Sequence, residues 1–178
     1  MVSDLVHDPV RRQRYRFEPE GDVLRVDIWI DPGGEVPEHL HPAQEERFEV
    51  RSGHVRFTVN GVRQDAGPGE RLAAPPGTKH RFENLGADEA RLRVEVEPAL
   101  DIRDFLEDAA KLAREGKYTR RGLPRGPRAA LEAAVFAHEY RRTTVLTSPL
   151  MVAQRPLLTA LAALGRRRGY KSPSARSR

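Results

Sequence analysis

Four side chains of the kind that bind metal ions occur at short intervals in the first half of this 178-residue chain. His39 and His41 are two positions apart, so on a β-strand both imidazoles project from the same face. A carboxylate follows at Glu46, and a third imidazole stands at His80. This donor set suits Fe, Mn, Ni, Co, Cu or Zn. Because the chain has no cysteine, a metal can be held only by His, Asp or Glu.

Two adjacent carboxylates, Glu45 and Glu46, could serve as the acidic ligand. Glu46 has the parity of the apolar Phe48, whereas Glu45 has the parity of charged neighbours. Since successive strand residues point to opposite faces, Glu46 is predicted to point into the core. His80 is likewise predicted to point inward, with Phe82 on its face. Burial of an unpaired carboxylate is costly, and a bound cation would remove that cost.

The segments that carry these residues have the alternation of short β-strands. Apolar and polar residues alternate over 24–30, 46–51, 55–59 and 91–97. This pattern indicates strands with one buried and one solvated face. Asn60-Gly61 follows the third of these segments and favours a tight hairpin. Strands separated by Gly and Pro turns, with no intervening helical pattern, predict an antiparallel barrel or sandwich.

The pattern becomes helical after Pro98. Asp101 is placed to cap a helix that ends near Gly116. A second helical run begins at Pro127, where a first helical turn tolerates proline. Pro156 is expected to kink or split a third, apolar segment.

Charge also divides the chain. Residues 1–100 carry 14 Lys and Arg against 19 Asp and Glu, a net charge of −5, and residues 101–178 carry 17 against 7, a net charge of +10. The contrast indicates an acidic body with a basic appendage. We therefore expect four segments: an N-terminal arm (1–14), a β-barrel (15–100), a helical C-terminal extension (101–165) and a basic, disordered tail (166–178).

Two spaced patterns contain all the candidate ligands. The first is Gly33-x5-His39-x-His41-x4-Glu46-x6-Gly53, and the second is Gly69-x5-Pro75-x-Gly77-x2-His80-x3-Asn84. Both resemble the two motifs of the cupin superfamily without a departure. With its helical extension, the chain is similar in layout to small single-barrel, quercetin-dioxygenase-like cupins of the cupin_2 type.

The resemblance implies a mainly β fold, an antiparallel jelly-roll cupin barrel followed by C-terminal α-helices. It also implies the ligands of one divalent transition metal ion: His39, His41, Glu46 and His80. Four protein ligands leave two positions of an octahedral metal open for substrate, water or dioxygen.

We therefore expect a metal-dependent oxidoreductase, an oxygenase that acts on a small organic substrate. Glu46 would be the catalytic residue, as a ligand and, after transient dissociation, as a base. Phe48, Phe57 and Phe82 are predicted to line the pocket. Two alternatives stay open: a cupin isomerase or decarboxylase, and a non-catalytic cupin that senses or stores a small molecule.

The sequence also bears on location and partners. Its N-terminus lacks the apolar core of a signal peptide, so a cytoplasmic protein is expected. Trp29 has the parity of the polar face, which suggests cover by a second copy of the chain, in a homodimer, or by the C-terminal helices. No nucleic-acid-binding motif is visible. A membrane span is not expected because Gln154, Arg155 and Pro156 interrupt the apolar segment, but contact of the C-terminal helices with a membrane surface stays open.

Overall fold

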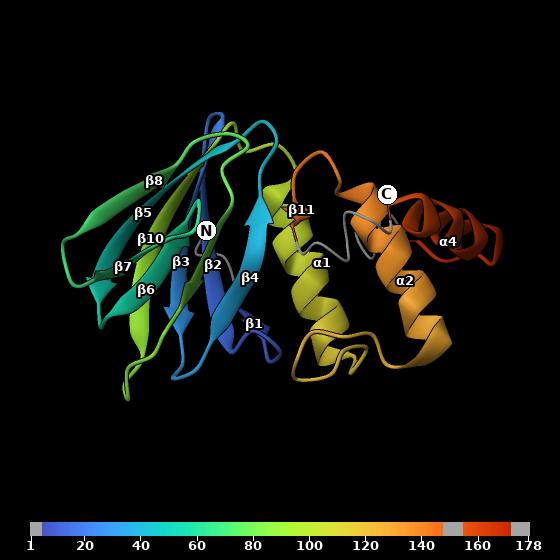
Figure 1. Cartoon of the computed structure of the whole chain (residues 1–178), viewed down its shortest axis with the longest axis horizontal. Helices are drawn as coiled ribbons and strands as arrows, with labels where there is room; N and C mark the ends of the chain where they lie inside the picture. Colours follow the sequence, from blue (N-terminus) through green and yellow to red (C-terminus); the bar gives the residue numbers. More distant parts are fainter. Residues whose placement is uncertain (1–4, 148–154, 172–178) are drawn as a thin grey trace.

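The computed structural model describes residues 5–147 and 155–171. Two antiparallel β-sheets face each other, and helices lie along one side of this barrel (Figure 1). The predicted fold, a mainly β jelly-roll barrel followed by C-terminal helices, is confirmed.

One sheet has six strands in the order β1-β2-β3-β10-β5-β8. These strands are β1 (Val6–Asp8), β2 (Gln13–Glu20), β3 (Val23–Ile30), β5 (Glu45–Ser52), β8 (Arg71–Ala74) and β10 (Ala90–Glu97). Val26 of β3 lies between Phe17 of β2 and Val94 of β10, so the apolar positions of neighbouring strands coincide. This register buries one face, as the alternation of the sequence predicts.

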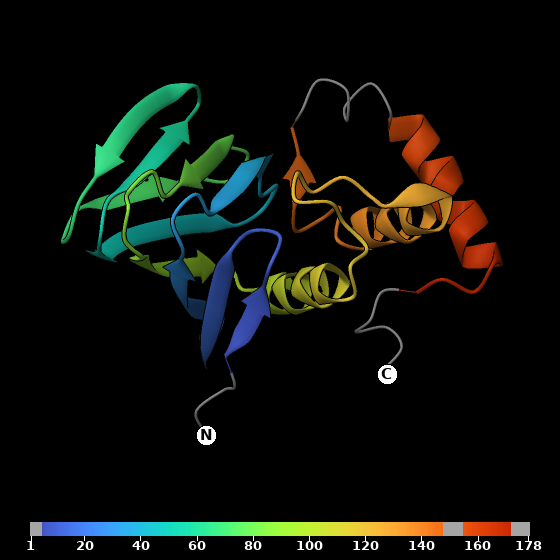
Figure 2. The same cartoon turned by 90° about the horizontal axis from the view of Figure 1, so that it is seen from below.

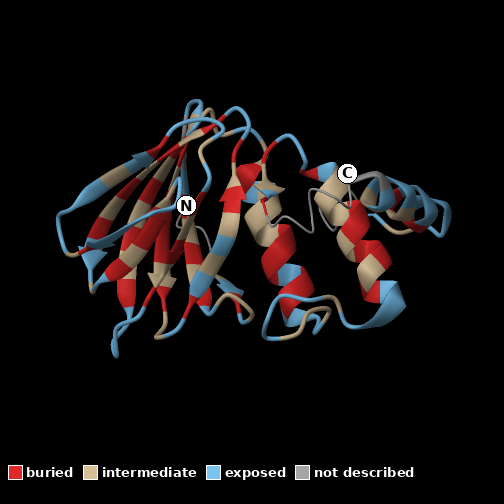
Figure 3. Ribbon diagram, viewed as in Figure 1, coloured by how far each residue is buried: buried red, intermediate tan, exposed pale blue. Residues whose placement is uncertain are grey.

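The second sheet has five strands in the order β11-β4-β9-β6-β7. These strands are β4 (Glu35–Leu40), β6 (Val55–Val59), β7 (Val62–Ala66), β9 (His80–Glu83) and β11 (Val145–Leu146). The predicted hairpin connects β6 to β7, with Asn60 at φ 47° and Gly61 at φ 81°. Positive φ at both turn residues matches the right-handed twist of the paired strands. Buried residues of both sheets form one core, and Figure 3 shows buried positions in red along the strands.

Helix α1 (Ile102–Arg114) packs directly against the barrel (Figures 1 and 2). Ile102 and Ala110 are buried in the barrel core, and Phe105 and Leu106 pack beside them. The helix therefore contributes side chains to the same apolar interior as the strands.

Asp101 occupies the N-cap position of α1 as predicted, but its side chain makes no capping hydrogen bond. Its Oδ1 instead accepts a hydrogen bond from Oγ1 of Thr143, 42 residues later in the chain. The expected side-chain cap is therefore wrong, because a tertiary donor takes the carboxylate.

Helices α2 (Gly126–Glu139) and α4 (Arg155–Arg167) lie farther from the barrel and pack against each other (Figure 2). A Cβ on Gly165 would lie 2.7 Å from Cγ2 of Val135, so glycine permits the close approach of the two helices. The predicted start of α2 near Pro127 is confirmed. The part of the third apolar segment that precedes Arg155 falls outside the described residues. No helix in 5–147 or 155–171 is long and apolar enough to cross a membrane.

The N-terminal residues differ from the expected arm, because β1 and β2 form the edge hairpin of the six-stranded sheet. Asp8 is fully buried and accepts hydrogen bonds from the backbone of Val10 and Arg11 and from the Arg11 guanidinium. Arg114 at the end of α1 donates to the carbonyl oxygen of His7. The predicted disordered tail begins at Arg166, but α4 continues to Arg167, so the helix extends into it. Residues 172–178 of that tail lie outside the described part of the chain.

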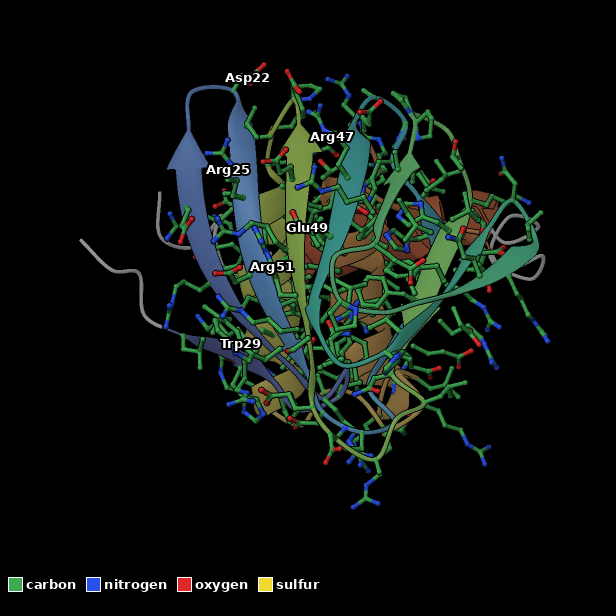
Figure 4. The ribbon with its side chains drawn as sticks, turned by 90° about the vertical axis from the view of Figure 1, so that its left-hand side faces the viewer. Asp22, Arg25, Trp29, Arg47, Glu49 and Arg51 are labelled. Atoms are coloured by element: carbon green, nitrogen blue, oxygen red, sulfur yellow. The ribbon has the colours of Figure 1, made fainter. Side chains whose placement is uncertain are left out.

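Trp29 lies on the outer face of the six-stranded sheet, away from the helices (Figure 4). The guanidinium carbons of Arg16 and Arg91 lie 5.2 and 4.8 Å from its ring centroid. Among the described residues, two arginines of neighbouring strands therefore lie over the ring, and the described helices lie on the other side of the sheet. The homodimer stays a prediction.

Candidate metal centre

The four candidate ligands lie together on the inner face of the barrel. His39 is in β4, His41 directly follows that strand, Glu46 is in β5 and His80 opens β9. Each is at most 8% exposed, and their donor atoms lie within 4.8 Å of one another. Such a buried cluster could hold a metal ion.

The backbone holds three of these residues in place by local pairing. His39 and His80 face each other in the register of β4 and β9, with ring centroids 4.3 Å apart. The loop before His80 is tied to the end of β4 because the Gly77 amide donates to the His41 carbonyl at 2.8 Å. Gly77 has φ 76°, a conformation that favours glycine. The glycine of the second motif therefore positions one ligand beside another.

Glu46 reaches the cluster because of its strand parity. Its side chain is buried inside the barrel, whereas Glu45 points outward and lies 3.5 Å from the guanidinium of Arg47. The prediction that Glu46 rather than Glu45 points into the barrel is confirmed. Within the described residues, the ion pairs of Glu46 are to His41 and His80 alone, and no Lys or Arg reaches it.

All three imidazoles are oriented by a backbone carbonyl at Nδ1. His39 donates to the Pro37 carbonyl and His80 to the Thr78 carbonyl, each at 2.9 Å. His41 donates at 2.7 Å to the carbonyl of Thr143, which follows α2. Since a carbonyl only accepts, Nδ1 carries the proton in each ring, and Nε2 is left to face the cluster.

The Nε2 atoms of His41 and His80 both face the Glu46 carboxylate, and this arrangement requires a proton or a metal ion between them. Nε2 of His80 lies 2.9 Å from one carboxylate oxygen, and Nε2 of His41 lies 3.4 Å from the other. A neutral ring presents a lone pair at Nε2, so it would repel the carboxylate unless a proton or a metal ion stands between them. Nε2 of His41 is buried and has no hydrogen-bond partner among the described residues. The donor chemistry and this orphaned atom both fit a divalent metal ion.

The pKa values of His39, His41 and Glu46 show which of these side chains carry a charge. Burial, together with the two nearby imidazoles, lowers the pKa of His39 to about 3, so this ring is neutral and able to ligate. Burial also opposes protonation of His41, but the Glu46 carboxylate outweighs it and raises the pKa of His41. Burial by itself would raise the pKa of Glu46, yet His41 and His80 hold it well below 4.5. The cluster therefore holds an ionised carboxylate among imidazoles.

A cavity of about 60 Å³ opens onto His39, His41 and Glu46. This volume has room for a few water molecules or a small organic group. Apolar side chains form most of the wall, from the barrel (Val26, Ile28, Phe48, Phe82, Val94 and Val96) and from α1 (Ile102, Phe105 and Leu106). The site is therefore a polar cluster at one end of a largely apolar chamber.

Of the three phenylalanines predicted to line the pocket, Phe48 and Phe82 do so. Phe57 is not among the residues lining this cavity. It packs behind the other two rings, with centroids 5.2 Å from Phe48 and 5.9 Å from Phe82. The reason is sheet order, because β6 lies two strands away from β4, which carries His39.

The cavity also contains a polar residue that sequence analysis did not select. Gln13 is 1% exposed, and its Oε1 accepts a hydrogen bond from the Tyr15 hydroxyl at 2.9 Å. Its Nε2 has no partner among the described residues, although a buried amide donor ordinarily has one. Gln13, Tyr15 and Phe17 are two residues apart and so share one strand face. This alternation could have predicted that Gln13 points into the barrel.

The remaining imidazoles lie elsewhere. His7 and His54 are exposed, in β1 and at the start of the β6 hairpin. His138 is half-buried in α2, where burial and the nearby Arg141 and Arg166 lower its pKa. None of the three approaches the cluster.

Comparison with known sequences points to one family. Residues 27–97 match the family model of the cupin domain. Protein SchB of Streptomyces halstedii is 35% identical over 69 residues, which cover 39% of this chain and 50% of SchB. Polyketide synthase CurC of Streptomyces cyaneus is 35% identical over 71 residues, which cover 38% of this chain and 44% of CurC. The chain thus spans about half the length of the curated relatives it matches.

Solved structures share the barrel. KdgF from Halomonas sp. has a TM-score of 0.50 and 20% identity over 56% of this chain and 91% of KdgF. An RmlC-like cupin from Shewanella frigidimarina has a TM-score of 0.51 and 21% identity over 56% of this chain and 87% of its own. Likeness at this identity shows that the chain has the fold of these cupin barrels. The match to the cupin domain model covers the same barrel region, residues 27–97.

Proposed function

We propose that this protein is a cupin and a metal-dependent oxygenase that acts on a small organic substrate. The observation that carries the proposal is the convergence of three Nε2 atoms and one carboxylate on a buried point at the end of an apolar cavity. A divalent transition metal bound there would supply Lewis acidity and, if it is redox-active, one-electron chemistry with dioxygen.

The chain's own residues prepare the site in three ways. The carbonyls of Pro37, Thr78 and Thr143 hold the imidazoles in the tautomer that directs Nε2 inward. Glu46 is held ionised, so it can serve as a ligand or accept a proton from a substrate carbon or hydroxyl. Phe48, Phe82 and the side chains of α1 give the cavity apolar walls beside the cluster.

The cavity indicates a class of substrate. Its walls favour a compact carbon skeleton, and the Nε2 donor of Gln13 would pair with a carbonyl or hydroxyl oxygen of the bound molecule. The name of one relative, a polyketide synthase, is consistent with such a molecule, because polyketides are carbon chains or rings that bear oxygen substituents. We therefore propose a small enolisable ketone or phenol.

The first experiment establishes the metal. Protein purified without chelator is expected to contain close to one transition metal ion per chain by elemental analysis. His39→Ala and His80→Ala should lose both the metal and turnover. Full turnover in a metal-free variant would contradict the proposal.

The second experiment separates the reaction classes. Protein loaded with Fe²⁺ and given a panel of phenols and enolisable ketones is expected to consume dioxygen, and the zinc form is expected to be inert. Equal product formation by the zinc form under nitrogen would instead support an isomerase or decarboxylase. Recovery of a co-purified small molecule unchanged by the iron form in air would support a non-catalytic binding protein.

A further inference from the structure

The histidine ligands differ in how far along the chain their orienting carbonyls lie. His39 and His80 each donate to a carbonyl two residues earlier, so their own strands orient them. His41 donates to Thr143, which is 102 residues away and beyond the region that matches the cupin model. Carbonyls of the barrel therefore orient the imidazoles of His39 and His80, and a carbonyl of the C-terminal extension orients the imidazole of His41.

Three elements fix the position of the Thr143 carbonyl. The Thr143 side chain is fully buried, and its Oγ1 donates to Asp101 at the start of α1. Its backbone amide donates to the carbonyl of Tyr140, at the end of α2, at 3.0 Å. The chain then continues into β11, where Val145 pairs with Leu40 of β4. The carbonyl is consequently clamped from α1, from α2 and from the strand that precedes His41.

The same extension closes the cavity. Ile102, Phe105 and Leu106 from α1, with Thr144 and Leu146 from the β11 region, share the cavity with His39, His41 and Glu46. The Tyr140 hydroxyl donates to Asp108 of α1 at 2.8 Å, so α1 and the segment that carries Thr143 are joined in the interior. A substitution that removes the hydrogen bond between Asp101 and Thr143 can therefore displace the Thr143 carbonyl, which is bonded to His41.

We propose that the C-terminal extension is a working part of the metal centre, and that Thr143 is a positioning residue that sets metal affinity through His41. This inference rests on the proposed metal binding. Outer-shell partners of ligating histidines fix the ring and its tautomer, and their loss typically costs about 10–100-fold in metal affinity. Because Asp101 makes no capping hydrogen bond, its replacement tests the Thr143 link without removing a helix cap.

The test measures the affinity of the full-length, metal-free protein for Co²⁺ and Zn²⁺ by chelator competition. Thr143→Val and Asp101→Ala each remove the side-chain bond that holds the carbonyl but keep the carbonyl itself. Both are expected to weaken metal binding measurably, by up to about tenfold, the lower end of the range for outright loss of an outer-shell partner. Thr143→Ser and Asp101→Asn keep a hydroxyl donor and an oxygen acceptor, so they should bind the metal as the wild type does.

Thr147→Val is the matched control for destabilisation. Thr147 is also buried and also bonds a carboxylate, that of Glu38, but none of its hydrogen bonds involves a ligand side chain. This variant should lower the melting temperature yet leave metal affinity unchanged. If Thr143→Val does not fold, the pair Asp101→Ala and Asp101→Asn provides the same comparison.

A spectroscopic readout distinguishes orientation from stability. Long-range ¹H–¹⁵N NMR of the metal-free protein, at a pH where the ring is neutral, should show His41 protonated at Nδ1 in the wild type. Thr143→Val should shift this ring toward protonation at Nε2. Wild-type affinity in both Thr143→Val and Asp101→Ala would overturn the inference, whereas a wild-type protein that binds neither ion would contradict the proposed function itself.

Discussion

Two of the buried carboxylates of this barrel, Asp27 and Glu46, lie on opposite faces of the same sheet and are neutralised in different ways. Asp27 of β3 lies under the outer face at 3% exposure and accepts three hydrogen bonds of 2.9–3.0 Å from Arg91 and Arg93. Glu46 of β5 lies on the inner face at 8% exposure and meets imidazoles alone among the described residues.

The difference concerns whether the neutralising charge is permanent. A guanidinium is protonated at every physiological pH, so Asp27 keeps its partners whatever the solution contains. An imidazole is cationic only when it holds a proton that a metal ion can displace. The outer carboxylate is therefore a fixed structural element, and the inner one is neutralised by an exchangeable cation. Four predictions test this distinction.

The largest effect is expected from Glu46→Gln. Its metal affinity should fall more than about 100-fold, since loss of an outer-shell partner already costs 10–100-fold. The free energy of unfolding of the metal-free protein should change by less than about 1 kcal/mol. The neutral amide loses the attraction to the imidazoles, but burying it does not require the desolvation of a charge. Chelator competition and urea denaturation measure the two quantities. Unaltered metal affinity in this variant would show that Glu46 is not a metal ligand.

Metal removal should have the next largest effect. At a free metal concentration about 100 times Kd, binding adds about 2.7 kcal/mol to stability. For a chain of this size, chelation should lower the melting temperature by about 5–10 °C. Differential scanning calorimetry of Glu46→Gln in the same buffers is the control, and it should show little change on chelation.

Asp27→Asn should destabilise the fold by about 2 kcal/mol at pH 7 and leave metal affinity intact. Burial alone raises the pKa of Asp27, but hydrogen bonds from Arg93 and Arg91 outweigh it and lower the pKa below 3.8. A lowered pKa stabilises the folded state above pH 3.8, and this contribution is lost as the pH falls through the native value. Denaturation of both proteins across pH 2.5–7 should show the difference shrinking only in the acid range. A difference independent of pH would contradict the assignment.

Trp29→Ala should have the smallest effect on the monomer, about 1 kcal/mol, because the contacts with Arg16 and Arg91 are partly exposed. Sedimentation at micromolar concentration tests whether a second copy also covers the ring. We expect a wild-type dimer that Trp29→Ala weakens. A monomeric wild type would contradict the dimer and would mean that no second copy of the chain covers Trp29.

Strand parity explains why the inward direction of the candidate ligands could be predicted from the sequence. His39, Glu46 and His80 occupy positions whose facing follows from an alternation of period two, which is a local property. The same rule extended to Gln13 would have placed that residue in the barrel. The burial of Asp27 was not predictable in this way, because its partners lie on a strand 64 residues away and depend on register.

The role of Thr143 could not be predicted for a different reason. Its interaction with His41 uses a backbone carbonyl, and every residue has one, so no side-chain type marks the position. Likewise, Asp101 has the appearance of a helix cap in the sequence, and only the folded chain supplies the competing donor. Long-range backbone contacts of this kind are fixed by packing rather than by local pattern.

The contact of His41 with Thr143 also has a consequence for protein synthesis. A ribosome completes the barrel strands through β10 well before it adds Thr143. During that interval a nascent chain has the four candidate ligands but lacks the carbonyl that orients one of them. If Thr143 sets metal affinity as proposed, a chain that ends before Thr143 is expected to bind the ion more weakly than the full chain.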